Sequence, residues 1–144
     1  MIAYFDTSAF VPLIVEEPTS VACRNQWAGA MSVCSTRLLY VEAVAALSAA
    51  ARAGRFGESE LTGSIARAAQ LWSDVDVIEL GEEVMLAAGE VARRFKLRGY
   101  DAVHCAAAWL LGDDDVVAIS GDRMLLDAWQ ELGIATLDPV AAAG

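Results

Sequence analysis

The sequence has few basic residues and a single lysine, Lys96. Lysine and arginine together number 10 against 20 aspartates and glutamates, so the formal net charge is −10 at pH 7. Binding nucleic acid by general electrostatic attraction needs a positive surface, and this composition argues against that mode. An aspartyl phosphatase or a phospho-acceptor receiver domain needs a lysine near its aspartate, so the scarcity of lysine argues against both. Any polyanionic substrate would need divalent cations to offset the negative charge.

Cysteines and long apolar runs are also scarce. Cys23, Cys34 and Cys105 are odd in number and scattered among apolar residues, which indicates reduced core thiols rather than a disulfide framework or a zinc site. Apolar stretches such as Phe10 to Val15 are too short to span a bilayer. No basic leader precedes an apolar segment near the N-terminus. We therefore expect a soluble, cytoplasmic protein.

The length and the apolar content favour one globular domain. A chain of 144 residues, of which 56% are hydrophobic, can bury roughly two-thirds of the surface that its unfolded form exposes. No low-complexity linker divides the sequence. We expect a single domain over residues 1–144, with a flexible tail at 139–144.

Five short apolar runs alternate with helical patterns. The runs are rich in β-branched and aromatic residues, and glycines end several of the helical stretches. This alternation predicts an α/β fold in which helices cover a parallel sheet. The expected strands are 1–5, 31–35, 75–80, 116–120 and 134–137, and the expected helices are 21–28, 37–53, 58–72, 82–96, 101–111 and 123–132.

Aspartates follow two of the expected strands and begin one expected helix. Asp6 comes directly after the first strand, Asp122 follows the fourth by two residues, and Asp101 begins the helix 101–111. The carboxyl ends of parallel strands meet at one edge of a sheet, so we expect these carboxylates to lie together. Taken singly, each aspartate is also explained by a helix N-cap or an Asx turn.

Glu42 lies on an apolar stripe of the expected helix 37–53. On a helical wheel it falls among Leu38, Ala45 and Ala46. Burying a glutamate on such a stripe is costly unless something compensates the charge. The alternative is a glutamate that reaches solvent from the edge of an alanine-rich helix.

Four carboxylates at one edge would repel one another. Unit charges about 4 Å apart cost roughly 4 kcal/mol at an effective dielectric constant of about 20, so such a cluster raises its pKa values or recruits cations. Oxygen ligands without histidine or cysteine favour Mg²⁺ or Mn²⁺ over zinc. Such ions support hydrolysis of a phosphodiester, because they activate water and stabilise the leaving oxygen.

The order of these motifs resembles that of the PIN-domain ribonucleases. The chain has DTSA near its N-terminus, a lone glutamate in the helix after the second strand, YDAVH opening a later helix, and SGDRML after a strand. Within that family it is similar to the toxin subunits of bacterial VapBC toxin–antitoxin pairs over essentially its whole length. The resemblance implies a three-layer α/β/α fold with strand order 3-2-1-4-5. It also implies a toxin that inhibits translation and growth by Mg²⁺- or Mn²⁺-dependent endonuclease cleavage of RNA.

The resemblance also assigns residue roles in the catalytic site. Asp6, Glu42 and Asp101 match the core metal ligands. Asp122 would complete the acidic site, either directly or through water.

Three further residues are expected behind these ligands. Ser8 matches a small hydroxyl residue that orients a water at the metal, and Ser120 stands where the family often has threonine. His104 is the only histidine and lies one helical turn after Asp101. With an unperturbed pKa near 6.5 it could serve as a general base. We favour a supporting or helix-packing role, because metal-activated water needs no imidazole.

The run ARRFKLR, just before YDAVH, is the only cluster of positive charge. Its basic residues either stabilise the C-terminal end of a helix or contact the RNA backbone. They are Arg93, Arg94, Lys96 and Arg98.

Protein partners are implied as well. Ala, Leu and Trp are abundant over 37–72, and an exposed apolar groove there would indicate a partner. Similarity to the toxins makes that partner a VapB-type antitoxin, whose C-terminal segment lies in the groove and places a basic side chain near the carboxylates. It also implies a homodimer and a substrate of the tRNA or rRNA class. The alternative from another class of protein is a catalytically silent module whose acidic pocket docks a basic partner peptide.

Overall fold

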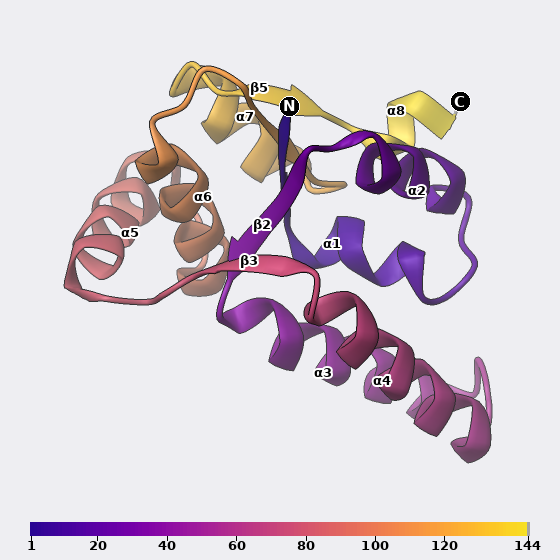
Figure 1. The fold of residues 1–144 in the computed structure, drawn as a ribbon. Coiled ribbons are helices and arrows are strands. Elements are labelled where there is room, and N and C mark those ends of the chain that lie inside the picture. The colour runs from indigo at the N-terminus through magenta and orange to yellow at the C-terminus, as the bar shows by residue number, and fades with distance from the viewer. Residues whose placement is uncertain (144) are drawn as a thin grey trace.

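A five-stranded parallel sheet forms the centre of the molecule (Figure 1). The computed structural model describes residues 1–143. The strands run in the order β3-β2-β1-β4-β5, and every neighbouring pair is parallel. This confirms the α/β class and the expected order 3-2-1-4-5. The strands are β1 (Ile2–Phe5), β2 (Ser32–Thr36), β3 (Val75–Ile78), β4 (Val116–Ile119) and β5 (Ala135–Leu137).

Helices cover both faces of the sheet and complete the three layers. In Figure 1, α5, α6 and α7 lie on one side, α1 and α2 lie on the other, and the α3–α4 hairpin projects from the edge where β2 ends. The helices are α1 (Thr7–Phe10), the 3₁₀ turn η1 (Val11–Leu13), α2 (Ser20–Gly29), α3 (Leu38–Arg52), α4 (Glu58–Trp72), α5 (Glu82–Phe95), α6 (Gly99–Leu111), α7 (Arg123–Glu131) and α8 (Pro139–Ala143).

The central strand β1 contributes side chains to the cores on both faces. Tyr4 faces α6 and α7, where its ring meets the Trp129 ring edge-on with centroids 5.7 Å apart. Phe5 points to the opposite face and packs against Trp27 of α2 at 5.4 Å. Because successive strand residues alternate between faces, aromatic packing holds β1 on both faces of the sheet. Asp6 follows it directly, in the middle of the carboxyl edge.

Several element boundaries differ by one or two residues from the sequence-based expectation, and the break between α5 and α6 is the informative case. Helix α6 begins at Gly99 rather than at Asp101, and the preceding helix ends before Lys96, which adopts a left-handed conformation with φ of 57°. A left-handed residue is a common helix terminator, so the break falls earlier than Gly99. Pro139–Ala143, in the tail from 139, form the short helix α8, and the expected flexibility of that tail stays a prediction. Gly144 of that tail lies outside the described residues.

The cysteines are buried and unpaired, as expected for core thiols. Burial raises the pKa of the Cys34 and Cys105 thiols to about 12 and that of Cys23 to about 11. A thiol that stays protonated is a poor nucleophile and a poor metal ligand. These three residues therefore serve packing rather than chemistry.

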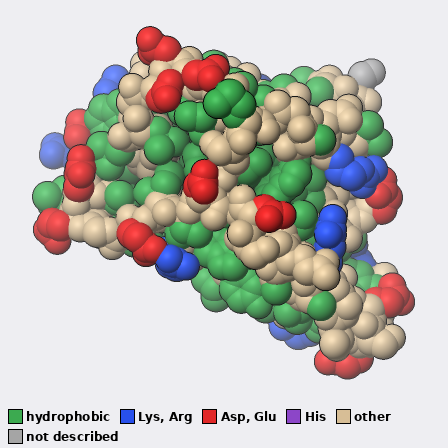
Figure 2. All heavy atoms as spheres, viewed as in Figure 1, with side chains coloured by type: hydrophobic (Ala, Val, Ile, Leu, Met, Phe, Trp, Pro, Cys, Tyr) green, Lys and Arg blue, Asp and Glu red, His purple; other side chains and the backbone are tan. Residues whose placement is uncertain are grey.

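Acidic side chains are spread over the face drawn in Figure 2, as the composition predicts. On the face drawn in Figure 2, lysine and arginine side chains are scattered among acidic ones and lie around a large apolar area. Over residues 1–143, no helix combines the length and the apolar character that crossing a membrane requires.

Candidate active site

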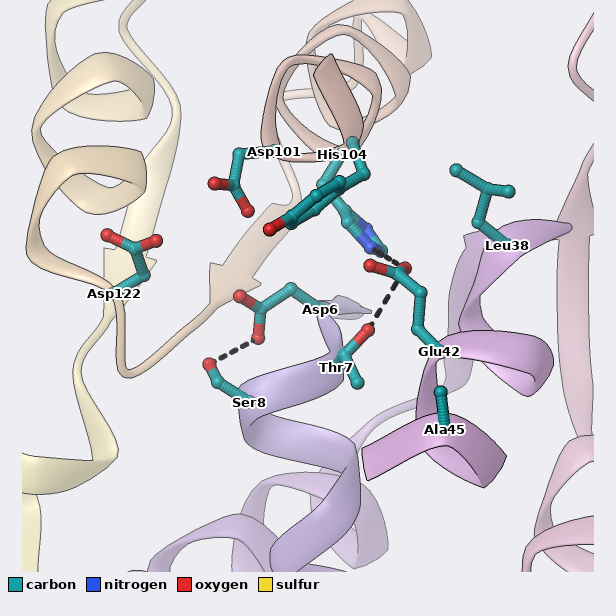
Figure 3. Close-up of a pocket in the computed structure, with 10 residues that line it drawn as sticks. Asp6, Thr7, Ser8, Leu38, Glu42, Ala45, Asp101, His104 and Asp122 are labelled. Atoms are coloured by element: carbon teal, nitrogen blue, oxygen red, sulfur yellow. Dashed lines mark hydrogen bonds and ion pairs between the residues drawn. The ribbon is translucent and has the colours of Figure 1, made fainter. Parts of the chain in front are cut away.

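All four acids singled out in the sequence line one cavity at the carboxyl edge of the sheet (Figure 3). The cavity has a volume of about 580 Å³. Carboxylates and hydroxyls dominate its polar lining, and among residues 1–143 no lysine or arginine lines it. The lining residues are Asp6, Thr7, Ser8, Leu38, Glu42, Ala45, Tyr100, Asp101, His104 and Asp122.

Asp6 is the most buried of the four acids, with a relative exposure of 5%. It is the N-cap of α1: its Oδ1 accepts hydrogen bonds from the Ala9 amide at 3.1 Å and from the Ser8 hydroxyl at 2.7 Å. Its Oδ2 accepts from the Ser120 hydroxyl at 2.5 Å. Burial still raises the pKa of Asp6 above its usual value. Asp6 is therefore both the N-cap of α1 and one of the acids that line the cavity. Its hydrogen bonds do not fully offset the cost of burying its charge.

The loop after β4 brings Asp122 to the cavity. The Gly121 amide donates to Ser8 Oγ at 2.8 Å, and the Asp122 amide donates to Ser120 Oγ at 2.9 Å. Asp122 Oδ1 caps α7 by accepting from the amides of Met124 and Leu125. No hydrogen bond within residues 1–143 engages Oδ2, so that oxygen is available to a ligand. Ser8 and Ser120 thus tie the loop to Asp6, and their role beside the metal ligands stays a prediction.

Glu42 reaches the cavity from α3 with 21% of its side chain exposed. Its Oε1 accepts from Thr7 Oγ1 at 3.1 Å and bonds to His104 Nε2 at 2.7 Å. In Figure 3 the other oxygen of Glu42 points toward Asp6. Glu42 therefore faces the acidic cavity, and solvation at the edge of an alanine-rich helix does not explain its position.

Asp101 lies in the first turn of α6, with 17% of its side chain exposed. Burial raises its pKa, and the nearby charge of Asp122 raises it further. Arg98 opposes both effects through an ion pair of 3.4 Å to Asp101 Oδ2. Repulsion between Asp101 and Asp122 is what a cation between them would relieve.

The chemistry of this donor set fits a hard divalent cation, because carboxylate oxygens are the ligands that Mg²⁺ and Mn²⁺ prefer. Within residues 1–143, however, no three side chains among Asp, Glu, His and Cys stand in a metal-binding arrangement. Mg²⁺ keeps several waters and is commonly held by one or two carboxylates directly. The cavity thus fits an ion that touches few side chains and reaches the others through water, and the four-ligand set stays a prediction.

Two cavity residues and one residue behind them were missed in the sequence. Thr7 supports Glu42, Tyr100 stands at the rim with 47% exposure, and Tyr4 hydrogen-bonds His104 from the core. Thr7 is part of DTSA and Tyr100 of YDAVH, so proximity to a predicted ligand was the available signal. Their contact partners depend on tertiary packing and leave no pattern in the sequence.

The four basic residues before YDAVH are all exposed, and none lines the cavity. Arg93 and Arg94 lie in the last turn of α5, where they complement the helix dipole. Arg98 is different, because it pairs with Asp101 and its guanidinium lies 5.3 Å from the Tyr100 ring centroid. Of this group, Arg98 is connected to the site most directly.

The raised pKa values predict that the metal-free protein becomes more stable on mild acidification. The folded state raises the pKa of Asp6 and Asp101 above the unfolded values, so it takes up protons while the unfolded chain, with Asp near 3.9, is still ionised. The free energy of unfolding should therefore rise as the pH falls from 7 toward about 4. Urea denaturation in EDTA at several pH values measures this contribution. Asp6→Asn should flatten the rise, and equal pH slopes for both proteins would contradict the prediction.

Known proteins resemble this chain over most of its length. The PIN domain family model matches residues 3–128. Ribonuclease VapC49 of Mycobacterium tuberculosis is 39% identical over 142 residues, covering 96% of this chain and 99% of the relative. Ribonuclease VapC47 of the same species is 31% identical over 143 residues, with 96% and 97% covered.

Solved structures share the fold at lower identity. PAE2754 from Pyrobaculum aerophilum superposes with a TM-score of 0.73 at 23% identity, covering 99% of this chain and 87% of that one. VapC20 of Mycobacterium tuberculosis, described as a Sarcin-Ricin loop cleaving toxin, gives 0.66 at 19% identity, with 88% and 94% covered. From the family match and the identity to its relatives, the chain belongs to the PIN-domain family and, within it, to the VapC group.

Proposed function

We propose that the protein is a metal-dependent endoribonuclease and the toxin subunit of a VapBC-type pair. The observation that carries this proposal is the cavity at the carboxyl edge, where Asp6, Glu42, Asp101 and Asp122 meet. No lysine or arginine of residues 1–143 lines the cavity, and Arg98 reaches only Asp101, from outside it. The relatives with the highest identity quoted above are named ribonucleases. Translation and growth are the processes that such cleavage would inhibit.

The four acids would hold the divalent cation, Mg²⁺ or Mn²⁺. When bound, such an ion supplies an activated water and neutralises charge on the scissile phosphate. Asp6 is oriented by Ser8 and Ser120, and the second oxygen of Asp122 is left available by its capping role. The chain's own contribution is thus a set of carboxylates held in place by hydrogen bonds, which limits reorganisation during the reaction.

Cleavage of total cellular RNA by the purified, antitoxin-free protein tests this proposal. We expect discrete fragments with Mg²⁺ or Mn²⁺ and none with EDTA, because the acidic cavity repels phosphate unless a cation is present. Cleavage that persists in EDTA would refute metal dependence. Binding of Mn²⁺ without any RNA turnover would favour the silent docking module instead.

Arg98 is the basic residue that we expect to contact the RNA backbone near the site. Arg98→Gln should weaken RNA binding and lower the slope of log affinity against log salt by about 1, as the loss of one phosphate contact does. Binding is measured in Mg²⁺ with an RNA analogue that cannot be hydrolysed, so that the cation is present and cleavage does not interfere. Arg67→Gln, an exposed arginine on α4, should leave the slope unchanged. If Arg98→Gln also left the slope unchanged, Arg98 would not contact the RNA backbone, and its role would be limited to pairing with Asp101.

An apolar groove beside the cavity is where we place the antitoxin. Val11, Val15 and Ala46 line a second hollow of about 290 Å³, which shares Thr7 and Ser8 with the acidic cavity. An apolar antitoxin segment in this groove would bring a following basic side chain to the carboxylates. Solved neighbours of the same fold include a toxin–antitoxin complex from Klebsiella pneumoniae, with a TM-score of 0.67 at 14% identity.

We also propose a homodimer. Large apolar side chains such as Leu86 and Val41 are 67% and 58% exposed on α5 and α3, and contact with a second copy would remove such surface from water. Sedimentation of the purified chain measures the association. A monomer that stays soluble and fully active without any partner would contradict both the dimer and the antitoxin.

A further inference from the structure

A buried chain of hydrogen bonds connects the core of the protein to Glu42. The Tyr4 hydroxyl on β1 lies 2.7 Å from His104 Nδ1 on α6, and His104 Nε2 lies 2.7 Å from Glu42 Oε1 on α3. Tyr4 is fully buried and His104 is 2% exposed. Three elements that are distant in sequence therefore meet through two short contacts. The second contact, between His104 and Glu42, ends on a carboxylate of the cavity (Figure 3).

The partners available to each atom assign the protons in this chain. A phenol carries one hydrogen to donate, and His104 Nδ1 is the hydrogen-bond partner of the buried Tyr4 hydroxyl. When Tyr4 donates to Nδ1, that nitrogen accepts and the neutral ring carries its hydrogen on Nε2. The Nε2–H then points at Glu42 Oε1, which accepts only. In this arrangement each of the four polar atoms of the hydrogen-bond chain has a partner, as buried polar groups require.

We propose that Tyr4 and His104 are positioning residues that select one orientation of the Glu42 carboxylate. His104 and Thr7 both occupy Oε1, so the second oxygen is left to face the cavity and a bound cation. Tyr4 acts through His104, because its hydroxyl keeps Nδ1 as an acceptor and holds the ring with its Nε2–H directed at Glu42. The part of the inference that makes Glu42 a metal ligand rests on the proposed function. The position of the hydrogen on the His104 ring does not depend on that function.

A helix-packing role alone does not account for these contacts. A histidine that merely filled space between α6 and the sheet would need no donor on one ring nitrogen and no carboxylate on the other. Carboxylates that ligate metals are themselves commonly hydrogen-bonded, and the loss of such outer partners lowers metal affinity by about 10- to 100-fold. The Tyr4–His104 pair supplies such an outer hydrogen bond to Glu42 from the buried core.

The tautomer is measured directly, because the chain has one histidine. In metal-free protein labelled with ¹⁵N-histidine, nitrogen NMR should show a neutral ring with the hydrogen on Nε2 and an unprotonated Nδ1. Tyr4→Phe removes only the hydroxyl and should shift the Nδ1 signal, because that nitrogen loses its hydrogen-bond donor while Glu42 still requires the hydrogen on Nε2. Tyr40→Phe, a matched loss of hydroxyl on α3 away from the cavity lining, should leave both signals unchanged. A hydrogen on Nδ1 in the wild type, or unchanged signals in Tyr4→Phe, would overturn the inference.

Calorimetric titration with Mn²⁺ tests the consequence for Glu42. Tyr4→Phe should bind Mn²⁺ about 10-fold more weakly than the wild type, while Tyr40→Phe binds equally well. Equal affinity in Tyr4→Phe would overturn the positioning role. If the wild type bound no Mn²⁺ and cut no RNA, the proposed function would fail, and the nitrogen spectra would still decide the tautomer. If Tyr4→Phe did not fold, the wild-type spectrum alone would decide it.

Discussion

Asp6→Asn is expected to lower the rate of RNA cleavage by at least about a thousandfold, which corresponds to about 4 kcal/mol of transition-state stabilisation. Asp6 stands at the centre of the carboxyl edge and lines the cavity with the three other acids. An amide at this position keeps the shape of the side chain but removes the charge that would attract the cation. The rate is measured with end-labelled RNA at saturating Mg²⁺.

The same substitution should not reduce stability. Burial raises the pKa of Asp6, so the ionised form costs folding free energy at neutral pH, and its removal relieves that cost. The Asn oxygen can still cap α1 at the Ala9 amide, and its NH₂ can donate to Ser120 Oγ. Asp114→Asn, an exposed loop residue, is the matched control and should change neither rate nor stability. An Asp6→Asn protein that cleaves at the wild-type rate would refute the site assignment.

Trp129→Ala is expected to cause the largest loss of stability, about 3 to 5 kcal/mol in the free energy of unfolding. Trp129 is fully buried beneath the sheet, where its ring packs edge-on against Tyr4 and its Nε1 donates to the Cys105 carbonyl at 3.3 Å. Truncation leaves a cavity under β1 and removes the hydrogen bond to the Cys105 carbonyl. Urea denaturation measures the loss, and the melting temperature should fall by about 10 °C.

Met124→Ala is the control on the same helix. Met124 is 55% exposed on α7, so its truncation should change the free energy of unfolding by no more than about 0.5 kcal/mol. Equal losses for the two variants would show that α7 does not pack through the Trp129 face. A small loss for Trp129→Ala would contradict the packing of β1 against α7.

The strand order was predictable only through the family resemblance, whereas the strands and most helices follow from local signals in the sequence. Apolar runs locate the strands, and glycines such as Gly54 and Gly112, which adopt positive φ angles of 84° and 60°, end helices where expected. The start of α6 was wrong because Gly99 reads as a helix breaker, whereas the left-handed conformation of Lys96 ends α5 earlier. Nothing in the residue type of Lys96 indicates that conformation.

The acids of the site were predictable because strand ends are local and share one edge of a parallel sheet. Asp6 and Asp122 follow directly from that rule. The hydrogen bonds that orient the acids were not predictable: His104 lies 62 residues from Glu42 and 100 from Tyr4. Their contact depends on how α6 and α3 come together at the carboxyl edge of the sheet. The sequence thus indicates which residues gather at the edge, while tertiary packing decides which oxygen of each carboxylate remains free.

The chemical ends of the RNA fragments test the central claim most directly. Attack by an activated water, as the acidic cation site predicts, leaves a terminal monophosphate on one fragment and a hydroxyl on the other. Attack by the neighbouring ribose hydroxyl leaves a 2′,3′-cyclic phosphate instead and needs no cation. Fragments made with Mg²⁺ should carry monophosphate and hydroxyl ends with no cyclic phosphate, as mass spectrometry can establish. Cyclic phosphate ends, formed equally in EDTA and by Asp6→Asn, would contradict the account.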